Sequence, residues 1–278
     1  MNAYACAAYC MHDPAGVGVA NELLKSLSYR LIEVPRAKTA YYITELDAIL
    51  AGFEDDVLYF EFLDEVCEVE FYIVLSRHSS EAGIRSLTVH HPGNPMREAK
   101  AGGKPLELSP SNPPLAKQLL LYLVENSRSL PGFDVTYEVT HHGPSSLKKP
   151  VTFVEIGSSI QEWSLPASHK AVAEAVIQAL SNPLPPNIEP VVGVGGNHYA
   201  AAFTSRALSS NEAYGHIIAN YALKSLEEPS LVKNVLFQAV TRSYLKTQKI
   251  VVEKKLRKAW RDAAESVAAE TRLEIEYI

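Results

Sequence analysis

The sequence has few cysteines and no long apolar run, and each absence excludes a class of protein. Among its 278 residues no stretch approaches the roughly 18 consecutive apolar residues of a membrane span, so we expect no membrane association. The three cysteines, Cys6, Cys10 and Cys67, form no Cys-x-x-Cys motif, and an odd number cannot all pair. This predicts buried thiols in a reducing cytoplasm rather than a disulfide framework. A Gly-x-Ser-x-Gly motif is also absent, so covalent catalysis is not indicated.

The composition is that of a folded globular protein. Hydrophobic residues make up 47% of the chain and charged residues 21%, and no low-complexity segment or internal repeat interrupts it. The length exceeds a typical domain of roughly 100–200 residues, so we expect one large domain or two lobes. We predict an N-terminal lobe over 1–112 and a C-terminal lobe over 113–278, which form one catalytic unit. Residues 94–114, rich in Gly, Pro and Ser, are the best candidate linker.

Positive charge is concentrated near the C-terminal end of an acidic chain. The net charge is −6, yet residues 242–261 carry +7 and the remainder therefore −13. A local basic surface suits contact with a phosphate-rich partner, and we assign this role to Lys254, Lys255 and Arg257. The alternative is a solvated helix face, which is a common reason for such a run.

Apolar, β-branched and aromatic runs alternate with helical patterns, which is typical of an α/β protein with a mixed, mostly parallel sheet. The expected strands are 3–10, 29–34, 69–76, 86–90, 135–140, 151–156, 190–194, 215–220 and 272–278. The expected helices are 18–27, 114–127, 168–180, 230–243 and 252–269. Because the strands are continuously apolar, we expect both faces of the sheet to be covered, as in a three-layer α/β/α fold.

Histidines and one glutamate follow the ends of several expected strands. In open α/β sheets ligands bind outside the carboxyl ends of the strands, so a parallel arrangement would bring these side chains together. The candidates are His78, His90, His141, His142, Glu155 and His198, with Arg77 nearby. For any one of them, a hydrogen-bonded structural histidine is the ordinary alternative.

Glu155 and the His141-His142 pair carry the strongest chemical information. A carboxylate in an apolar strand costs free energy unless it is paired, hydrogen-bonded or bound to metal. Glu155 could therefore be a zinc ligand, a general base for water, or the partner of Arg77. Adjacent side chains in a strand point to opposite faces, so His141 and His142 can address one atom only if the chain turns, which Gly143 permits.

Two glycine-rich turns and one serine are further candidates for binding. Gly16-Val17-Gly18 lacks the third glycine of a dinucleotide fingerprint, so we exclude a nicotinamide site. The backbone N–H groups of Gly195 and Gly196 could approach an oxyanion or a ribose, although the sequence alone favours a plain strand-to-loop turn. Ser158 could cap the following segment or bind substrate, and capping is the safer interpretation.

Eight short motifs in matching order resemble the archaeal and plant type of D-aminoacyl-tRNA deacylase. They are Ser76-Arg77-His78-Ser79-Ser80, Leu87-Thr88-Val89-His90, Gly102-Gly103-Lys104-Pro105, Leu108-Ser109-Pro110-Ser111, Thr140-His141-His142-Gly143-Pro144, Phe153-Val154-Glu155-Ile156-Gly157-Ser158, Glu162-Trp163 and Gly195-Gly196-Asn197-His198-Tyr199. The resemblance covers about residues 1–221. The last motif departs from the family pattern at Asn197 and Ala201, which affects the expected loop shape but not the histidine.

This resemblance implies a zinc-dependent hydrolase that releases D-amino acids from tRNA, on a fold similar to the phosphorylase and peptidyl-tRNA hydrolase group. Candidate catalytic residues are His78, His90, His142 and Glu155. Candidate zinc ligands are His141, Glu155 and His198. Candidate substrate contacts are Arg77, Ser158, Gly195, Gly196, Lys254, Lys255 and Arg257. We expect a cytoplasmic monomer or homodimer, and water rather than a side chain as the nucleophile.

Two other functions fit the same residues. A metal-dependent hydrolase of small molecules would use the histidines and Glu155 without needing the basic segment. A non-catalytic tRNA-binding protein would use the basic segment and leave the histidines unexplained. Salt dependence separates the first from a tRNA enzyme, because phosphate contacts make affinity fall steeply with salt.

Overall fold

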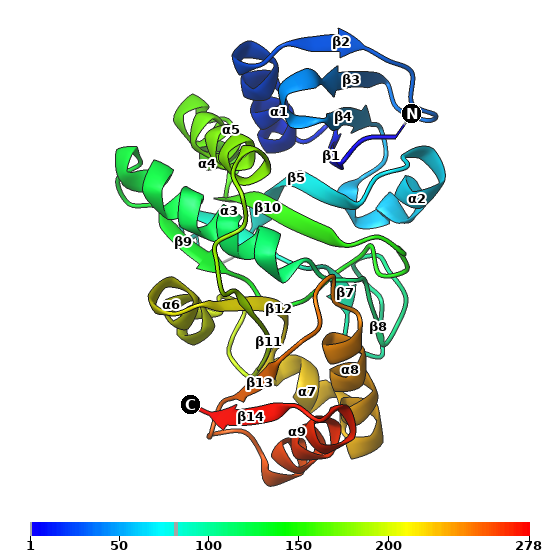
Figure 1. Ribbon diagram of the computed structural model, residues 1–278, viewed down its shortest axis with the longest axis vertical. Helices are drawn as coiled ribbons and strands as arrows, with labels where there is room; N and C mark the ends of the chain where they lie inside the picture. The colour runs from blue at the N-terminus through cyan, green and yellow to red at the C-terminus, as the bar shows by residue number, and fades with distance from the viewer. Residues whose placement is uncertain (1, 81–82) are drawn as a thin grey trace.

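The computed structural model describes residues 2–80 and 83–278, whose strands form two main sheets (Figure 1). The larger sheet has the order β2-β3-β4-β1-β5-β10-β6-β9, and the smaller has the order β12-β11-β13-β14. The larger sheet consists of β1 (Ala5–Cys10), β2 (Tyr29–Leu31), β3 (Thr39–Ile43), β4 (Ala48–Phe53), β5 (Phe71–Ser79), β6 (Ser86–His90), β9 (Asp134–Tyr137) and β10 (Val151–Ser158). The smaller consists of β11 (Glu189–Val194), β12 (Glu212–Ile218), β13 (Lys249–Val252) and β14 (Glu274–Tyr277), and β7 (Gly93–Asn94) pairs with β8 (Glu107–Leu108).

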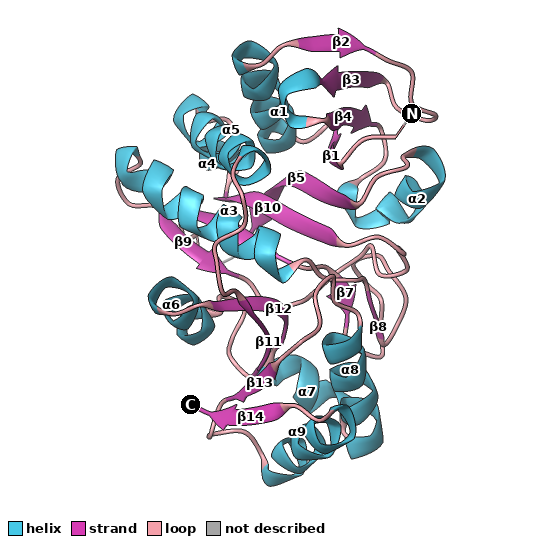
Figure 2. Cartoon of the chain, in the orientation of Figure 1, coloured by secondary structure: helices cyan, strands magenta, loops and turns pink. Residues whose placement is uncertain are grey.

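The α-helices cover the sheets, and the cartoon coloured by secondary structure shows their distribution (Figure 2). They are α1 (Pro14–Ser26), α2 (Leu63–Val66), α3 (Pro113–Asn126), α4 (Ile160–Trp163), α5 (Pro166–Ser181), α6 (Ala201–Ser209), α7 (Asn220–Leu226), α8 (Pro229–Thr241) and α9 (Lys258–Thr271). Short 3₁₀ helices are η1 (Thr44–Leu46), η2 (Val57–Phe62) and η3 (Ser127–Ser129). Local sequence sets two long helices: Asp13 caps α1 and Asn112 caps α3, each followed by proline at the first turn.

Three apolar clusters hold the helices against the faces of the two sheets. One apolar cluster joins α1, α3 and α5 to one face of the larger sheet and extends through α3 and α6 to the smaller sheet. A second cluster covers the opposite face of the larger sheet beneath η2 and α2. A third packs α7, α8 and α9 on the far face of the smaller sheet. Helix α3 therefore lies against both sheets and connects them.

The predicted fold class is confirmed. Both sheets are predominantly parallel, with antiparallel pairs β2–β3, β3–β4 and β6–β10 in the larger one. All three pairs of the smaller sheet are parallel. In the described part of the chain no helix is both long and apolar enough to cross a bilayer. The likeness to the phosphorylase and peptidyl-tRNA hydrolase group stays a prediction.

The structure corrects several expected elements. Strands β3, β4 and β13 were not predicted. The expected helix 252–269 begins later than predicted: β13 ends at Val252, a loop follows, and α9 starts at Lys258. The stretch 94–114 is not a free linker: it contains β8, and Ser109, Ser111 and Asn112 in it are buried. Strands β9 and β10 follow residue 112 but lie in the larger sheet, so the sheets do not follow the predicted lobes, whose boundary stays a prediction.

Candidate functional site

The site begins on one face of the larger sheet, where three neighbouring strands present polar side chains. Register pairs Ser76 of β5 with Glu155 of β10, and Glu155 with Thr88 of β6. His78 lies two residues beyond Ser76, and His90 two residues beyond Thr88. Because alternate residues of a strand point to the same side, these side chains share a face. It is the face opposite α1, α3 and α5.

The predicted convergence is real, but its geometric reason was wrong. Strand β6 runs antiparallel to β10, so His90 lies beside Phe153 in the middle of β10 rather than at a common sheet edge. The ring of His90 stacks on that of Phe153 with centroids 5.1 Å apart. His78 and Glu155 are likewise members of their strands, not of the loops that follow. The geometric reason is therefore wrong for His90, whereas the other members lie at or near the carboxyl ends of β5, β9, β10 and β11.

Glu138, which the sequence interpretation did not select, is the centre of the cluster. Its carboxylate is fully buried and contacts three imidazoles. Oε1 lies 3.2 Å from Nδ1 of His78, and Oε2 lies 3.4 Å from Nε2 of His141 and 3.0 Å from Nε2 of His198. Its sequence signal was the same as that of Glu155, a carboxylate between apolar neighbours in an expected strand.

Glu155 is held in place by two neighbours from β5. The hydroxyl of Ser76 donates a hydrogen bond of 2.6 Å to its Oε1, and Nδ1 of His78 lies 3.4 Å from its Oε2. A pair with Arg77, one of the alternatives raised by the sequence, is not what the structure contains. The other nitrogen of His78, Nε2, lies 3.1 Å from the hydroxyl of Tyr199.

His141 and His142 both enter the cluster because the chain turns between them. His142 adopts a left-handed conformation with φ of 49°, and the two ring centroids lie 4.3 Å apart. Nδ1 of His141 lies 2.8 Å from the carbonyl of Val139, and Nδ1 of His142 lies 2.7 Å from that of Gly143. Since a carbonyl accepts, each Nδ1 carries the proton, which leaves Nε2 with its lone pair. Nε2 of His142 lies 3.2 Å from Nε2 of His90.

Backbone pairing between the two sheets completes the site. The amide of Val139 donates to the carbonyl of His198, and the amide of Ala200 donates to the carbonyl of Tyr137, so that Glu138 and Tyr199 lie opposite each other. Glu138 follows β9 of the larger sheet, whereas His198 follows β11 of the smaller sheet. The cluster therefore lies at the junction between the sheets.

Burial and neighbouring charges shift the pKa values of these groups in different directions. Burial alone would raise the pKa of Glu138, but His198 and the neighbouring imidazoles lower it to about 2. Burial lowers the pKa of His141 to about 3, and it also lowers that of His90 well below its usual value. Burial opposes the charge on His78, yet Glu155 and Glu138 outweigh it and raise the pKa of His78. One imidazole thus holds a proton next to carboxylates, while two others stay neutral and free to act as ligands.

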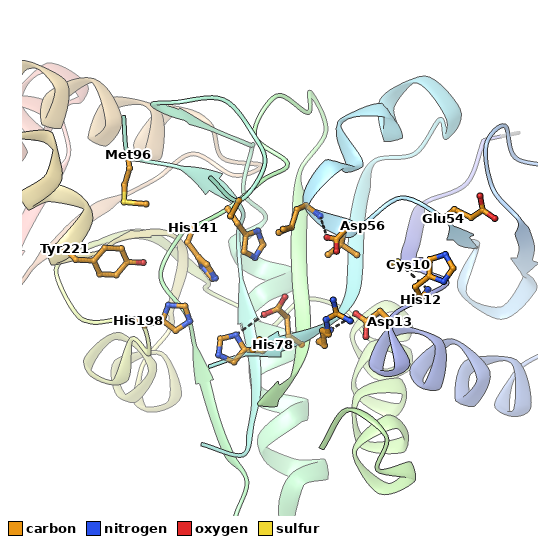
Figure 3. Close-up of a pocket in the computed structure, with 17 residues that line it drawn as sticks. Cys10, His12, Asp13, Glu54, Asp56, His78, Met96, His141, His198 and Tyr221 are labelled. Atoms are coloured by element: carbon orange, nitrogen blue, oxygen red, sulfur yellow. Dashed lines mark hydrogen bonds and ion pairs between the residues drawn. The ribbon is translucent and has the colours of Figure 1, made fainter. Parts of the chain in front are cut away.

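A cavity of about 640 Å³ opens onto the cluster. His78, His141, His142, Glu155 and His198 line it, as does the predicted substrate contact Arg77. In Figure 3, His78, His141 and His198 lie together, with Met96 and Tyr221 beyond them, whereas Cys10, His12, Asp13, Glu54 and Asp56 lie toward the other end. The cavity therefore extends from the histidine cluster toward the segments that follow β1 and β4.

Several predicted substrate contacts lie elsewhere among the described residues. The amide of Gly195 donates to the carbonyl of Ile218, and that of Gly196 donates to the carboxylate of Glu253, both at 2.9 Å. Because these amides are already bonded and line no part of the described cavity, the structure does not place an oxyanion hole there. Ser158 ends β10 and is buried, and it is the neighbouring Ser159 rather than Ser158 that caps α4, through a capping box.

Only part of the basic segment is exposed to solvent. Lys254, Lys255 and Arg257 are exposed in the loop between β13 and α9, outside the described cavity lining. Lys249 is instead buried within the smaller sheet, where it pairs with Glu189, Glu212 and Glu276. The exposed charge is thus smaller than the sequence total suggested.

The fold and the cavity define an α/β protein with a buried histidine–carboxylate site. Residues 65–276 match the family model for D-aminoacyl-tRNA deacylase. Two curated D-aminoacyl-tRNA deacylases, of Desulfurococcus amylolyticus and Staphylothermus marinus, are 42% and 41% identical to this chain over 276 residues. The alignments cover 97% of this chain and 98% of each relative. A crystal structure of a conserved protein of unknown function superposes with a TM-score of 0.90 at 30% identity, covering 99% of this chain and 95% of the other. The chain belongs to the D-aminoacyl-tRNA deacylase family, as its motifs predicted.

Proposed function

We propose that this protein hydrolyses the ester bond between a D-amino acid and the 3′-terminal ribose of tRNA, releasing free D-amino acid and tRNA. The family supports the reaction. The observation that carries the assignment of the site is the Glu138 cluster, in which one buried carboxylate contacts His78, His141 and His198 beside a cavity. A histidine–carboxylate site with no nucleophile elbow is suited to attack by water.

We propose Zn²⁺ as the cofactor, because the donor set fits it. Both carboxylate oxygens of Glu138 and Nε2 of His198 are buried without a geometrically sound hydrogen bond among residues 2–80 and 83–278. Three overlapping groups of donor atoms, each within 4.8 Å, occur in the cluster. Imidazole nitrogen and carboxylate oxygen are zinc ligands, and carbonyl-bonded Nδ1 atoms like that of His141 are the usual outer support.

The residues that would hold zinc are the predicted His141 and His198 together with Glu138, whose carboxylate contacts both imidazoles, while Glu155, which was also predicted as a ligand, is assigned the role of general base. When bound, zinc supplies Lewis-acid activation of water and of the ester carbonyl. The protein's own groups prepare the reaction in two ways. Ser76 and His78 hold Glu155 so that its carboxylate can accept a proton from the attacking water. His198 lines the cavity, so it would place the cofactor next to the bound substrate.

tRNA is the proposed partner, and Lys254, Lys255 and Arg257 are its proposed phosphate contacts. We expect their combined replacement by alanine to weaken tRNA binding and to reduce the slope of log affinity against log salt by about 2–3. Lys170→Ala, on the exposed face of α5, is the matched control and should leave the slope unchanged. An unchanged slope in the triple variant would remove this loop from the tRNA-binding surface.

The first experiment is release of amino acid from D-Tyr-tRNA and L-Tyr-tRNA, with and without a chelator. We expect release from the D-ester alone and loss of activity on chelation. Glu138→Gln should lower kcat/KM by roughly 100-fold and reduce bound zinc, measured by elemental analysis. The control is His169→Gln. His169 bonds the backbone carbonyl of Trp163 and is not part of the cluster, so this variant should keep both its kcat/KM and its bound zinc. Equal activity of Glu138→Gln and the unmodified protein would refute the assignment of the site.

The same experiment separates the two alternatives. A small-molecule hydrolase would cleave a D-aminoacyl ester lacking tRNA as fast as the tRNA ester, at all salt concentrations. A non-catalytic binding protein would bind tRNA but release no amino acid from either ester. Faster cleavage of the tRNA ester at low salt supports the deacylase function.

A further inference from the structure

Two cysteines from distant parts of the chain lie side by side in the core of the larger sheet. Cys6 is on the central strand β1, and Cys67 follows α2, 61 residues later. Their sulfur atoms are 3.7 Å apart. Cys6 is completely buried, whereas Cys67 is 5% exposed. One thiol of the pair therefore lies near the surface and the other beneath it.

Hydrogen bonds to Cys67 and to the residue after it hold this segment against β1. The hydroxyl of Tyr72, whose residue pairs with Cys6 in the sheet, donates a bond of 3.1 Å to the carbonyl of Cys67. The amide of Cys67 donates to the carbonyl of Leu63 at the end of α2. One residue further along, the carbonyl of Glu68 accepts a bond from the amide of Ala3. The two sulfur atoms are thus kept close by bonds that do not involve the thiols.

We propose that Cys6 and Cys67 are an oxidation site that forms an intramolecular disulfide when the protein meets hydrogen peroxide. The proposal is independent of the hydrolytic activity. Disulfide formation requires sulfur atoms that reach about 2.05 Å, and side-chain rotation from a neighbouring position is the usual route to it. The closed loop would contain about 60 residues and join the central strand to the segment before β5.

The reaction balances with peroxide as the oxidant. The thiolate of Cys67 attacks one peroxide oxygen, the O–O bond breaks, and a sulfenic acid forms with loss of hydroxide. The sulfur of Cys6 then attacks the sulfenic sulfur, the S–O bond breaks, and water leaves. Two thiols and one hydrogen peroxide become one disulfide and two water molecules. The contact with Cys6 lowers the pKa of Cys67, while the same contact and burial raise that of Cys6, which matches these roles.

The surface around Cys67 favours a small neutral oxidant. Asp64, Glu65, Glu68 and Glu70 surround it in sequence, and the last three are exposed. This negative charge repels oxidised glutathione, which is a bulky anion. Hydrogen peroxide is uncharged and small, which suits a cysteine whose residue is only 5% exposed.

The third cysteine provides the matched control. Cys10 lies on the same face of β1 as Cys6, four residues further along the strand. Its sulfur accepts a hydrogen bond of 3.4 Å from the amide of His12 rather than contacting a thiol. Burial raises the pKa of Cys10, which makes its thiol a weaker nucleophile. Cys10→Ser should therefore leave the oxidation of Cys6 and Cys67 unchanged.

The test is peroxide treatment of the full-length native protein, followed by tryptic mapping without reductant. We expect the peptides 1–25 and 39–77 to be linked, with a mass two hydrogens below their sum. The link should persist in Cys10→Ser and disappear in Cys6→Ser and Cys67→Ser. Because Cys6 and Cys10 share a peptide, these variants identify the partner.

Thermal unfolding gives a second readout on the same samples. A closed loop of this length should raise Tm by roughly 10 °C after oxidation, and the rise should be reversed by dithiothreitol. A link that survives Cys6→Ser would assign the bond to Cys10 and overturn the proposal. Unlinked peptides with Cys67 converted to sulfinic acid would overturn it equally, because Cys6 would have failed to react.

Discussion

A buried ion network in the smaller sheet gives the sharpest quantitative prediction. The side chain of Glu212 on β12 is 2% exposed and pairs with Arg206 of α6 and Lys249 of β13. Nε of Arg206 donates to it at 2.8 Å, and the hydroxyl of Tyr214 donates at 2.7 Å. Burial alone would raise the pKa of Glu212, but the bonds from Arg206, Lys249 and Tyr214 lower it to about 2.

The magnitude follows from this pKa. A fall from the ordinary value of 4.5 to about 2 corresponds to about 3 kcal/mol in favour of the folded state with Glu212 ionised. Breaking a buried ion pair by removing one partner costs about 3–5 kcal/mol, which agrees. Because the folded pKa lies below the unfolded one, the stabilisation is complete above pH 4.5. It is lost as the pH falls from about 4.5 to about 2.

The assay is urea unfolding of the unmodified protein and of Glu212→Gln. We expect the variant to be less stable by about 3 kcal/mol at pH 7 and by about 1 kcal/mol at pH 3. Asp262→Asn, which removes an exposed partner of Lys258, is the control and should change stability by less than about 0.5 kcal/mol. A difference for Glu212→Gln that is the same at both pH values would refute the argument, because it would show that ionisation is not the source.

Three further substitutions test the site and its support. Ser76→Ala removes the hydroxyl bonded to Glu155 and should lower kcat roughly 10-fold with KM and Tm unchanged; a change in KM alone would contradict the positioning role. Tyr199→Phe should lower kcat, since its hydroxyl bonds Nε2 of His78, which in turn holds Glu155, and an unchanged kcat would refute this. Lys117→Met removes the buried ammonium that bonds three carbonyls at the end of α6 and the start of β12. It should cost about 2–4 kcal/mol in urea unfolding, against almost none for Lys170→Met.

Local patterns were sufficient for the elements with strong periodicity or clear ends. Strand 86–90 was predicted with the observed bounds, and helix 114–127 was placed within one residue, because its apolar stripe and preceding prolines are unambiguous. The family motifs also pointed to histidines and a glutamate that the structure brings together, while their roles stay predictions. These features are encoded within a few residues.

The missed strands show where local pattern fails. Lys249–Val252 has only four residues and precedes a run rich in Lys and Arg, so its apolar character merged with the amphipathic pattern of α9. Thr39–Ile43 and Ala48–Phe53 are antiparallel partners joined by a short turn, and pairing with β1 decides their conformation. Strand formation there is a tertiary effect.

The site itself was predicted in its members but not in its geometry. Expected convergence at parallel strand ends assumed that β6 runs with β10, whereas the two are antiparallel. Sheet direction is decided by long-range packing and is not written in any short segment. Glu138 carried the same local signal as Glu155, but its contacts with His78, His141 and His198 are long-range and could not be read from that segment.

The junction between the sheets has a consequence for how the protein can fail. Glu138 and His198 approach each other through backbone bonds that join 137–139 to 198–200. Glu138 and His141 follow β9 of the larger sheet, whereas His198 follows β11 of the smaller one, so the set of residues proposed to hold zinc is complete only when both sheets are folded and joined. A change that loosens the bonds between 137–139 and 198–200 would therefore separate these ligands even where each sheet keeps its own core.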